Sequence, residues 1–286
     1  MAKAQEVKER IQSVKSIQQV TRAMKMVADA KLKKAQRAIE QARPYAYKIR
    51  NALSQLLPQI DRELNPLLEV RPVETVGLVI ITADRGLCGA FNSRIIRRAE
   101  QEIEKYTSEQ VSLICIGKKG LRYFQRRDHR IIGEYVDFFK ALTFSSATSI
   151  AEVITNAFLQ NHLDRIDILY NEFKNIIQQD VVVEQFLPLV VEEDEEMDSL
   201  DEFIFEPDAK TFVDSLIPRH LNVQMWRMLL ESNAAEQGAR RTAMDNATSN
   251  AEDMIKDLQM EYNKARQAAI TKEISEIVGG AEAMAE

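Results

Sequence analysis

The first 43 residues contain neither glycine nor proline, and their apolar side chains recur at alternating spacings of three and four. This spacing puts the side chains on one line along a helix, as in the heptads of a coiled coil. The aligned positions are Val7, Ile11, Val14, Ala28, Leu32, Ala35, Ile39, Ala42, Ala46, Ile49, Leu53 and Leu56. A helix of about 55 residues would be roughly 80 Å long, so we expect it to project from any single domain. Pro44 either kinks this helix or is absorbed within it.

The heptad line changes character in its middle. Three positions in the line are polar there, namely Gln18, Thr21 and Lys25. The apolar stripe steps back by one residue in the same stretch, to Ile17, Val20, Met24 and Val27. A step of one residue turns the stripe by about 100° around the helix. This stretch is therefore expected to face something other than a partner helix alone.

The C-terminal part of the chain repeats the helical pattern. Between residues 219 and 278 there is no proline and a single glycine, Gly238, which is expected to cost about 1 kcal/mol against alanine and to soften the helix locally. A 3-4 line runs through Met244, Ala247, Ala251, Met254, Leu258, Ala265 and Ala268, and a second stripe through Ile270, Ile274, Ile277, Ala281 and Met284. Because alanine is frequent on both terminal helices, their backbones can approach closely. We expect the two helices to pair antiparallel.

The middle of the chain alternates strand and helix patterns. The expected strands are Val76–Ile81, Val111–Ile116, Arg165–Tyr170 and Val181–Leu187, with a weaker one at Arg130–Val136. The expected helices lie at about 90–106, 118–127 and 147–162. Such β-α-β-α order is typical of a mostly parallel sheet covered by helices.

These patterns predict a mixed fold of the α+β or α/β class, in which a Rossmann-like α/β domain is inserted between two helices that form a long antiparallel coiled coil. The expected boundaries are an N-terminal coiled-coil helix at 1–57, a linker at 58–75, the α/β domain at 76–190, an acidic loop at 191–208 and a C-terminal coiled-coil helix at 209–286.

The charge of the chain is distributed unevenly. The net charge is −6, yet residues 1–56 hold 13 Lys and Arg against 4 Asp and Glu, while residues 192–208 hold ten acids and no base. A basic helix on an acidic chain indicates an acidic partner, a nucleic acid or an assembly. The basic side chains surround the helix and few aromatic residues accompany them, which argues against nucleic acid.

No set of residues has the spacing of a catalytic site. The turn Gly86-Leu87-Cys88-Gly89 lies between a strand and a helix but lacks the third glycine of a dinucleotide fingerprint, so it is either an anion site or an ordinary turn. Cys88 is either a reactive thiol or a packing residue. The three histidines are scattered, without the spacing of zinc ligands. We predict no cofactor and no metal, and a mechanical or scaffolding part rather than an enzyme.

Four ordered blocks of the sequence resemble the gamma-subunit family of F-type ATP synthases, the central stalk rotor, in its bacterial form. The blocks are Ile11–Gln36 (IQSVKSIQQVTRAMKMVADAKLKKAQ), Thr82–Asn92 (TADRGLCGAFN), Ala235–Ala247 (AEQGARRTAMDNA) and Tyr262–Gly280 (YNKARQAAITKEISEIVGG). Departures from the family pattern occur at Ala83, Ala90, Gly238 and Arg241. They put details of contact in doubt but not the resemblance, which covers essentially the whole chain.

The resemblance implies a non-catalytic rotor shaft. It would carry the rotation of a proton-driven membrane c-ring to a ring of alpha and beta subunits for ATP synthesis, and work in reverse in ATP hydrolysis. The implied partners are the alpha, beta and epsilon subunits and the c-ring, with no nucleic acid and no direct membrane insertion. The implied location is peripheral, at the cytoplasmic face of the bacterial plasma membrane. A non-rotary coiled-coil scaffold with an α/β docking domain is the alternative.

The resemblance also assigns residues. Contact with the beta subunit and coupling would involve Met24, Lys25, Glu236, Arg240, Gln267, Thr271 and Glu273, although Met24 could instead fill the coiled-coil core. The basic residues Arg22, Lys31, Lys33, Lys34 and Arg37 would face acidic loops of beta. An apolar bearing tip would consist of Ile274, Ile277, Val278 and Met284, and contact with the c-ring and epsilon would involve Phe203, Phe205 and Glu206.

Overall fold

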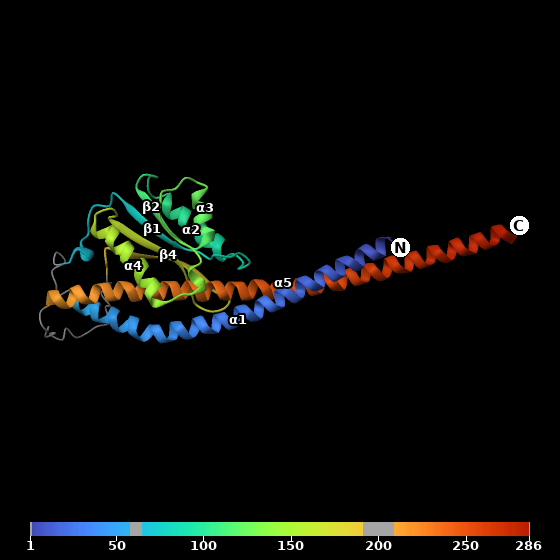
Figure 1. Cartoon of the computed structure of the whole chain (residues 1–286), viewed down its shortest axis with the longest axis horizontal. Coiled ribbons are helices and arrows are strands. Elements are labelled where there is room, and N and C mark those ends of the chain that lie inside the picture. Colours follow the sequence, from blue (N-terminus) through green and yellow to red (C-terminus); the bar gives the residue numbers. More distant parts are fainter. Residues whose placement is uncertain (1, 58–64, 191–208, 286) are drawn as a thin grey trace. The chain divides into compact units, whose positions relative to one another are not determined.

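The computed structural model describes residues 2–57, 65–190 and 209–285. In chain order its elements are α1 (Ala2–Leu56), η3 (Pro66–Leu68), β1 (Val76–Ile81), α2 (Phe91–Ile103), β2 (Val111–Ile116), α3 (Lys118–Gln125), β3 (Ile131–Tyr135), η4 (Phe138–Lys140), α4 (Phe144–Leu159), β4 (Arg165–Phe173), β5 (Gln179–Leu187) and α5 (Ala209–Ala285). The chain forms two compact units, one of Asp29–Arg240 and one of Met1–Ala28 with Arg241–Glu286. We call them the sheet unit and the helical unit. The two long helices, α1 and α5, contribute to both (Figure 1).

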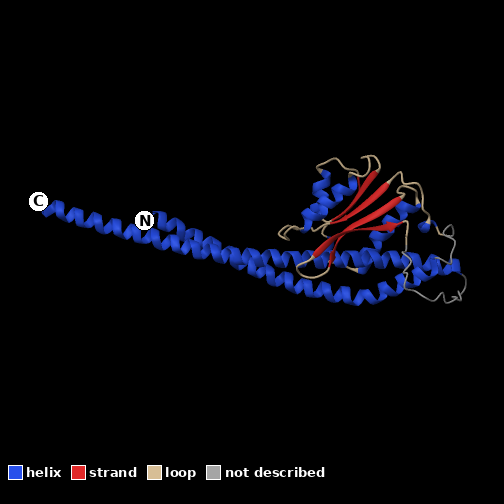
Figure 2. Ribbon diagram, turned by 180° about the vertical axis from the view of Figure 1, so that it is seen from behind, coloured by secondary structure: helices blue, strands red, loops and turns tan. Residues whose placement is uncertain are grey.

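The sheet unit is built around five strands in the order β3-β2-β1-β4-β5 (Figure 2). Neighbouring strands from β3 to β4 are parallel, and β5 returns antiparallel to β4. The central strand β1 carries no polar side chain and all six of its residues are buried. A strand that is covered on both faces requires such a continuous apolar run.

Successive residues of β1 face opposite sides of the sheet, so each face has its own apolar cluster. Leu78 belongs to a cluster with Ile95 of α2 and Phe124 of α3. Val79 belongs to a larger cluster that includes α4, the end of α1 with Leu53, and residues of α5. The sheet is therefore layered between α2 and α3 on one face and α4 with the two long helices on the other.

In the sheet unit, α1 buries the apolar line that its sequence predicts. Leu32, Ala35, Ile39, Ile49, Leu53 and Leu56 are all buried. Pro44 lies inside α1, which continues through it as one helix from Ala2 to Leu56. The guanidinium of Arg43 lies 3.7 Å from the carboxylate of Glu231, which places α1 beside α5 here.

The helical unit consists of the remaining parts of α1 and α5. The hydroxyl oxygens of Thr21 and Thr248 are 2.8 Å apart, and Lys25 Nζ lies 2.7 Å from Asp245 Oδ1. Rising numbers in α1 thus meet falling numbers in α5, so the helices are antiparallel. Within this unit the C-terminal end of α5 extends past the N-terminal end of α1 (Figure 1).

The predicted fold class is confirmed, and several element limits differ from prediction. Helix α4 starts at Phe144 instead of 147, because Thr143 and Ser146 form a capping box that begins the helix earlier. The weak strand prediction at 130–136 is confirmed as the edge strand β3. Strands β4 and β5 are longer than predicted because they form a hairpin whose pairing extends to Phe173 and Gln179.

Two positions of the predicted α5 line are wrong. Met254 is 52% exposed, whereas Ile255 is 8% exposed and takes its place. Ala268 is exposed and the half-buried Ala269 replaces it. Ala247 and Thr248 are both half-buried, and the Thr248 hydroxyl is hydrogen-bonded to that of Thr21 on α1. Ala251, Leu258 and Ala265 keep their predicted places in the line.

Candidate functional site

A stripe of apolar side chains on α1 is uncovered in the helical unit. Ile17, Val20 and Val27 are 55%, 58% and 57% exposed, and Met24 beside them is half-buried. The heptad line is continued instead by Gln18, Thr21 and Lys25, of which Thr21 is 8% exposed. We call Ile17, Val20, Met24 and Val27 the α1 stripe. An exposed apolar patch of this kind marks a surface that another protein covers.

Lys25 and Met24 lie at the boundary between the buried line and the α1 stripe. The ammonium of Lys25 pairs with Asp245 across the two helices, while its side chain is 31% exposed. Met24 is half-buried, so its side chain contributes to both the helix pair and the outer surface. The structure therefore gives Lys25 a partner within the chain, which the sequence did not predict.

A basic surface continues along α1 into the sheet unit. Lys33, Lys34 and Arg37 line a hollow of about 480 Å³ together with Ala30, Ala38 and Gln41. Lys31 and, in the helical unit, Arg22 are also exposed. Cations gathered on one open helix surface attract an anionic partner.

Glu236 and Arg240 lie one turn apart on α5, inside the sheet unit. The Arg240 guanidinium forms an ion pair with Glu236 and donates a hydrogen bond to the carbonyl of Gly86 in the loop after β1. Their side chains are only 8% and 11% exposed. Burial raises the pKa of the Glu236 carboxyl even though Arg240 opposes that rise. Glu236 is thus paired with a basic group within the chain, and Arg240 attaches α5 to the loop that contains Gly86.

Hydrogen bonds hold the loop after β1, residues 82–90, which we call the Gly86 loop. Asn92 Oδ1 accepts a 2.9 Å hydrogen bond from the backbone N–H of Ala83, and Asp84 Oδ1 accepts from the N–H groups of Lys118 and Asp137 at 3.1 and 2.9 Å. Cys88 is 1% exposed, and burial raises the pKa of its thiol. These contacts support the ordinary-turn and packing interpretations of this motif.

The coupling residues predicted near the C-terminus lie on exposed parts of α5. Gln267, Thr271 and Glu273 are all exposed, and the Thr271 hydroxyl donates a 3.0 Å hydrogen bond to the Gln267 carbonyl. That bond stays within the helix and involves only the main chain of Gln267. These side chains are accessible to another subunit.

The predicted bearing tip is also exposed. Ile274, Ile277 and Val278 are 56%, 70% and 51% exposed. Met284 lies in α5, but its side chain is outside what the structure describes. Phe203, Phe205 and Glu206, predicted to contact the c-ring and epsilon, lie outside the described residues.

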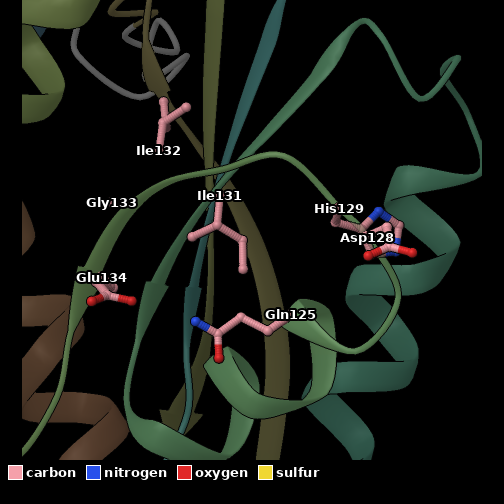
Figure 3. Close-up of a pocket in the computed structure, with 7 residues that line it drawn as sticks. All are labelled: Gln125, Asp128, His129, Ile131, Ile132, Gly133 and Glu134. Atoms are coloured by element: carbon pink, nitrogen blue, oxygen red, sulfur yellow. The ribbon is translucent and has the colours of Figure 1, made fainter.

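An open hollow of about 510 Å³ lies along the edge strand β3 (Figure 3). Gln125, Asp128, His129 and residues 131–134 line it. Figure 3 shows Asp128 and His129 together on one side and Glu134 on the other. The His129 ring packs edge-on against Phe124, with centroids 5.5 Å apart. His129 is thus a packing residue at the rim of the hollow.

The described ranges contain neither a candidate metal-binding cluster nor a candidate membrane-spanning helix. Residues 2–57, 65–190 and 209–285 hold no cluster of three or more His, Cys, Asp or Glu side chains that could bind a metal ion. In the same ranges no helix combines the length and the apolar character needed to cross a bilayer.

Sequence reasoning did not identify a partly buried polar cluster between α5 and the β4–β5 hairpin. Glu184 of β5 contacts Arg227 of α5, and Glu231 of α5 contacts the backbone of Phe173. The available signal was Glu231 itself, which follows the apolar run Met228-Leu229-Leu230 and lies only 3% exposed. A carboxylate at such a position needs a partner.

Comparison with known proteins matches residues 3–284 to the family model described as ATP synthase. The ATP synthase gamma chain of Prosthecochloris aestuarii is 47% identical over 290 residues, covering 99% of both chains. That of Salinibacter ruber is 47% identical over 307 residues, covering 100% of this chain and 99% of the relative.

Solved structures show the same fold. A chain of the Euglena gracilis mitochondrial ATP synthase (OSCP/F1/c-ring) aligns with a TM-score of 0.70 at 23% identity, over 99% of this chain and 95% of that one. A chain of the Tetrahymena thermophila mitochondrial ATP synthase central stalk and c-ring aligns with a TM-score of 0.62 at 25% identity, over 80% and 99%. The resemblance seen in the sequence is confirmed, and the chain belongs to the ATP synthase gamma chain family, the non-catalytic subunits of the central stalk.

Proposed function

We propose that this chain is a rotor shaft that turns inside a ring of alternating alpha and beta subunits, at the cytoplasmic face of a bacterial plasma membrane. A membrane c-ring driven by protons would turn it during ATP synthesis, and ATP hydrolysis in the ring would turn it the other way. The chain itself carries out no chemistry. It acts as a partner whose contacts favour some conformations of beta over others.

Such a shaft works by differential binding. A beta subunit changes conformation only to the extent that the shaft binds one conformer better than another. A rotating shaft must therefore present different surfaces at different angles. The single observation that carries the proposal is the α1 stripe, because it is apolar and exposed on one side of α1 while α5 occupies another.

The coupling residues fall into an exposed and a buried group. Gln267, Thr271 and Glu273 are exposed and would contact beta directly, as would Met24 of the α1 stripe and Lys25 next to it. Arg240 and Glu236 are largely buried within the sheet unit. Their effect on coupling would pass through the Gly86 loop that Arg240 contacts.

Different parts of the shaft would contact different partners. Ile274, Ile277, Val278 and Met284 would turn within an apolar sleeve of the ring, where contacts without directionality allow sliding. Their exposure supports this for the three side chains that are described. The segment with Phe203, Phe205 and Glu206 would meet epsilon and the c-ring, an assignment that rests on the family resemblance.

Reconstitution with alpha and beta subunits from the same source tests the proposal. We expect one copy of this chain per alpha-beta ring by native mass spectrometry, and ATPase activity that depends on its addition. Gln267→Leu should weaken the coupling of proton transport to ATP turnover in the full enzyme. Gln259→Leu, at another exposed position of α5, is the matched control and should leave coupling unchanged.

Failure to assemble would favour the non-rotary scaffold. ATPase activity that ignores the chain would also contradict the proposal. Equal coupling in Gln267→Leu and the parent would remove Gln267 from the contact set while leaving the shaft function in place.

A further inference from the structure

Within the sheet unit, three polar contacts attach α5 to the strands and loops between β1 and β5. We call this part of the unit, residues 76–187, the α/β layer. The contacts join Arg227 to Glu184, Glu231 to the backbone of Phe173, and Arg240 to the carbonyl of Gly86. We call these the anchor contacts. All of them lie within Asp29–Arg240, and α5 continues from there as one helix to Ala285.

The first anchor contact is a network centred on Glu184 of β5. Arg227 Nη2 lies 2.8 Å from both carboxylate oxygens of Glu184. Gln224 Nε2 and the Tyr170 hydroxyl donate further hydrogen bonds to Glu184 at 2.9 and 2.8 Å. Burial works to raise the pKa of Glu184, but Arg227 and the donated hydrogen bonds outweigh it and hold that pKa below its ordinary value. The contact is therefore a charged one at neutral pH.

The second anchor contact ties three elements through one carboxylate. Glu231 is 3% exposed on α5. Its Oε2 accepts a 3.0 Å hydrogen bond from the backbone N–H of Phe173 at the end of β4. Its Oε1 lies 3.7 Å from Arg43 of α1. Glu231 thus connects both long helices to the β4–β5 hairpin.

The third anchor contact, made by Arg240, lies farther along α5 and on a different side of the helix. Arg227 and Arg240 are separated by 13 positions in the sequence, which corresponds to about 20 Å along a helix and roughly 140° around it. The helix is therefore held at different heights and on different sides. A single contact would act as a pivot, whereas contacts separated in this way oppose rotation of α5 about its own axis.

Directional contacts resist turning in a way that apolar packing does not. A hydrogen bond weakens steeply as its angle departs from linear, while apolar attraction depends mainly on area. We propose that the anchor contacts are the positions through which torque passes between the α/β layer and α5. This inference rests on the proposed shaft function, and it assigns Arg227, Glu184 and Glu231 as positioning residues for rotation.

The test is a single-molecule rotation assay on the reconstituted alpha-beta ring with this chain. A bead is attached through Ser108→Cys, an exposed site of the α/β layer, because Cys88 and Cys115 are buried and do not compete for the label. The angular variance of the bead at each ATP-waiting dwell reports torsional stiffness. The double variant Glu184→Gln with Arg227→Met removes both charges together, so that neither is left buried alone.

We expect the double variant to raise the angular variance by up to about 1.5-fold, because the loss of one of three equal contacts acting in parallel leaves about two thirds of the stiffness. The unloaded ATPase rate should stay unchanged, which a general loss of folding would not allow. The matched control is Arg165→Met with Asp167→Asn. It removes a 2.9 Å ion pair with a buried carboxylate within β4, away from α5.

Equal variance in the double variant and the control would overturn the inference. If the double variant does not assemble, Tyr170→Phe decides, since it removes only the hydroxyl that bonds to Glu184. A smaller rise in variance is then expected, and none would contradict the inference. A parent chain that does not rotate on addition of ATP would instead contradict the shaft function itself.

Discussion

Helix α5 has two stretches that differ in what surrounds them. Up to Arg240 it lies in the sheet unit, where Met225, Met228 and Leu229 are fully buried and the anchor contacts hold it. Beyond Arg240 it lies in the helical unit and buries a single line of side chains, leaving Ile274 and Ile277 exposed. One helix therefore serves as a fixed part of a domain and as a surface left open for partners.

Helix α1 shows the same contrast with similar side chains. Leu53 in the sheet unit is 0% exposed, whereas Ile17 in the helical unit is 55% exposed. The difference comes from what covers each residue and not from its hydrophobicity. Folding stability should therefore reside in one stretch of each long helix, and partner recognition in the other.

Alanine substitutions at Leu53 and Ile17 should show the largest difference between an effect on folding stability and an effect on partner recognition. Leu53→Ala leaves a cavity in the main apolar cluster and should lower the free energy of unfolding by about 3 kcal/mol. Ile17→Ala removes an exposed side chain and should change it by less than about 0.5 kcal/mol. Chemical denaturation of the isolated chain measures both values.

The ATPase rate of the reconstituted ring gives the complementary result. Ile17→Ala should reduce activation by the chain, because it truncates the α1 stripe. A large stability loss from Ile17→Ala would show that the α1 stripe is covered within the chain. Full activation by the same variant would remove Ile17 from the contact surface.

The sequence predicted the parts of this contrast that follow from periodicity. The line from Leu32 to Leu56 and the positions of the strands along the middle of the chain depend on local spacing, and both are confirmed. The contact between Thr21 and Thr248 was missed because it links positions that are 227 residues apart. The anchor contacts were missed for the same reason.

Gly238 has a role that helix propensity alone does not predict. The sequence indicates its cost in helix propensity but not the residues of the β4–β5 hairpin that pack against it. A side-chain Cβ at this position would lie 3.3 Å from the Phe173 ring and 3.7 Å from the carbonyl of Ile176. Glycine therefore leaves room for the β4–β5 hairpin to pack closely against α5.

The second-largest effect is expected at low pH, where His220 should lower the free energy of unfolding of the sheet unit. Burial lowers the pKa of His220 to about 4, and Arg227 and Arg50 add to the shift while Glu184 opposes it. Below pH 6.5 the unfolded chain binds a proton that the folded chain refuses, so stability falls as the pH drops from 6.5 toward 4. The loss attributable to His220 should be about 2 kcal/mol at pH 5 compared with pH 7.5.

Paired variants isolate this contribution from the titration of other groups. His220→Gln should flatten the dependence of unfolding free energy on pH between 5 and 7.5. His162→Gln, at an exposed position of the same unit, is the control and should preserve the slope. An unchanged slope in His220→Gln would mean that the imidazole is protonated in the folded chain.

Gly238→Ala tests the approach of the hairpin, with an effect of smaller size. Alanine gains about 1 kcal/mol in helix propensity, and the Phe173 ring must shift by a few tenths of an ångström to admit its Cβ. Phe173 is buried in an apolar cluster, so displacing its ring offsets most of that gain, and we expect a net change of less than about 0.5 kcal/mol. Gly238→Val should destabilise, and an alanine that destabilises beyond this range would show that the hairpin is held rigidly.

The smallest effect on folding is expected at Lys25, where the helical unit offers a direct test of contact. The Lys25–Asp245 pair is 31% and 50% exposed on its two side chains, and exposed ion pairs contribute little to stability. Lys25→Gln and Asp245→Asn should therefore both leave the unfolding midpoint unchanged.

Their effects on coupling should differ even though their effects on folding do not. If Lys25 serves only to bind Asp245, the two variants break the same pair and must impair coupling equally. If Lys25 also contacts an acidic group of the beta subunit, Lys25→Gln removes that contact while Asp245→Asn releases the ammonium to strengthen it. We expect reduced proton transport per ATP in Lys25→Gln alone. Equal loss in both variants would confine Lys25 to the helix pair, and the surface facing beta would then be the apolar α1 stripe by itself.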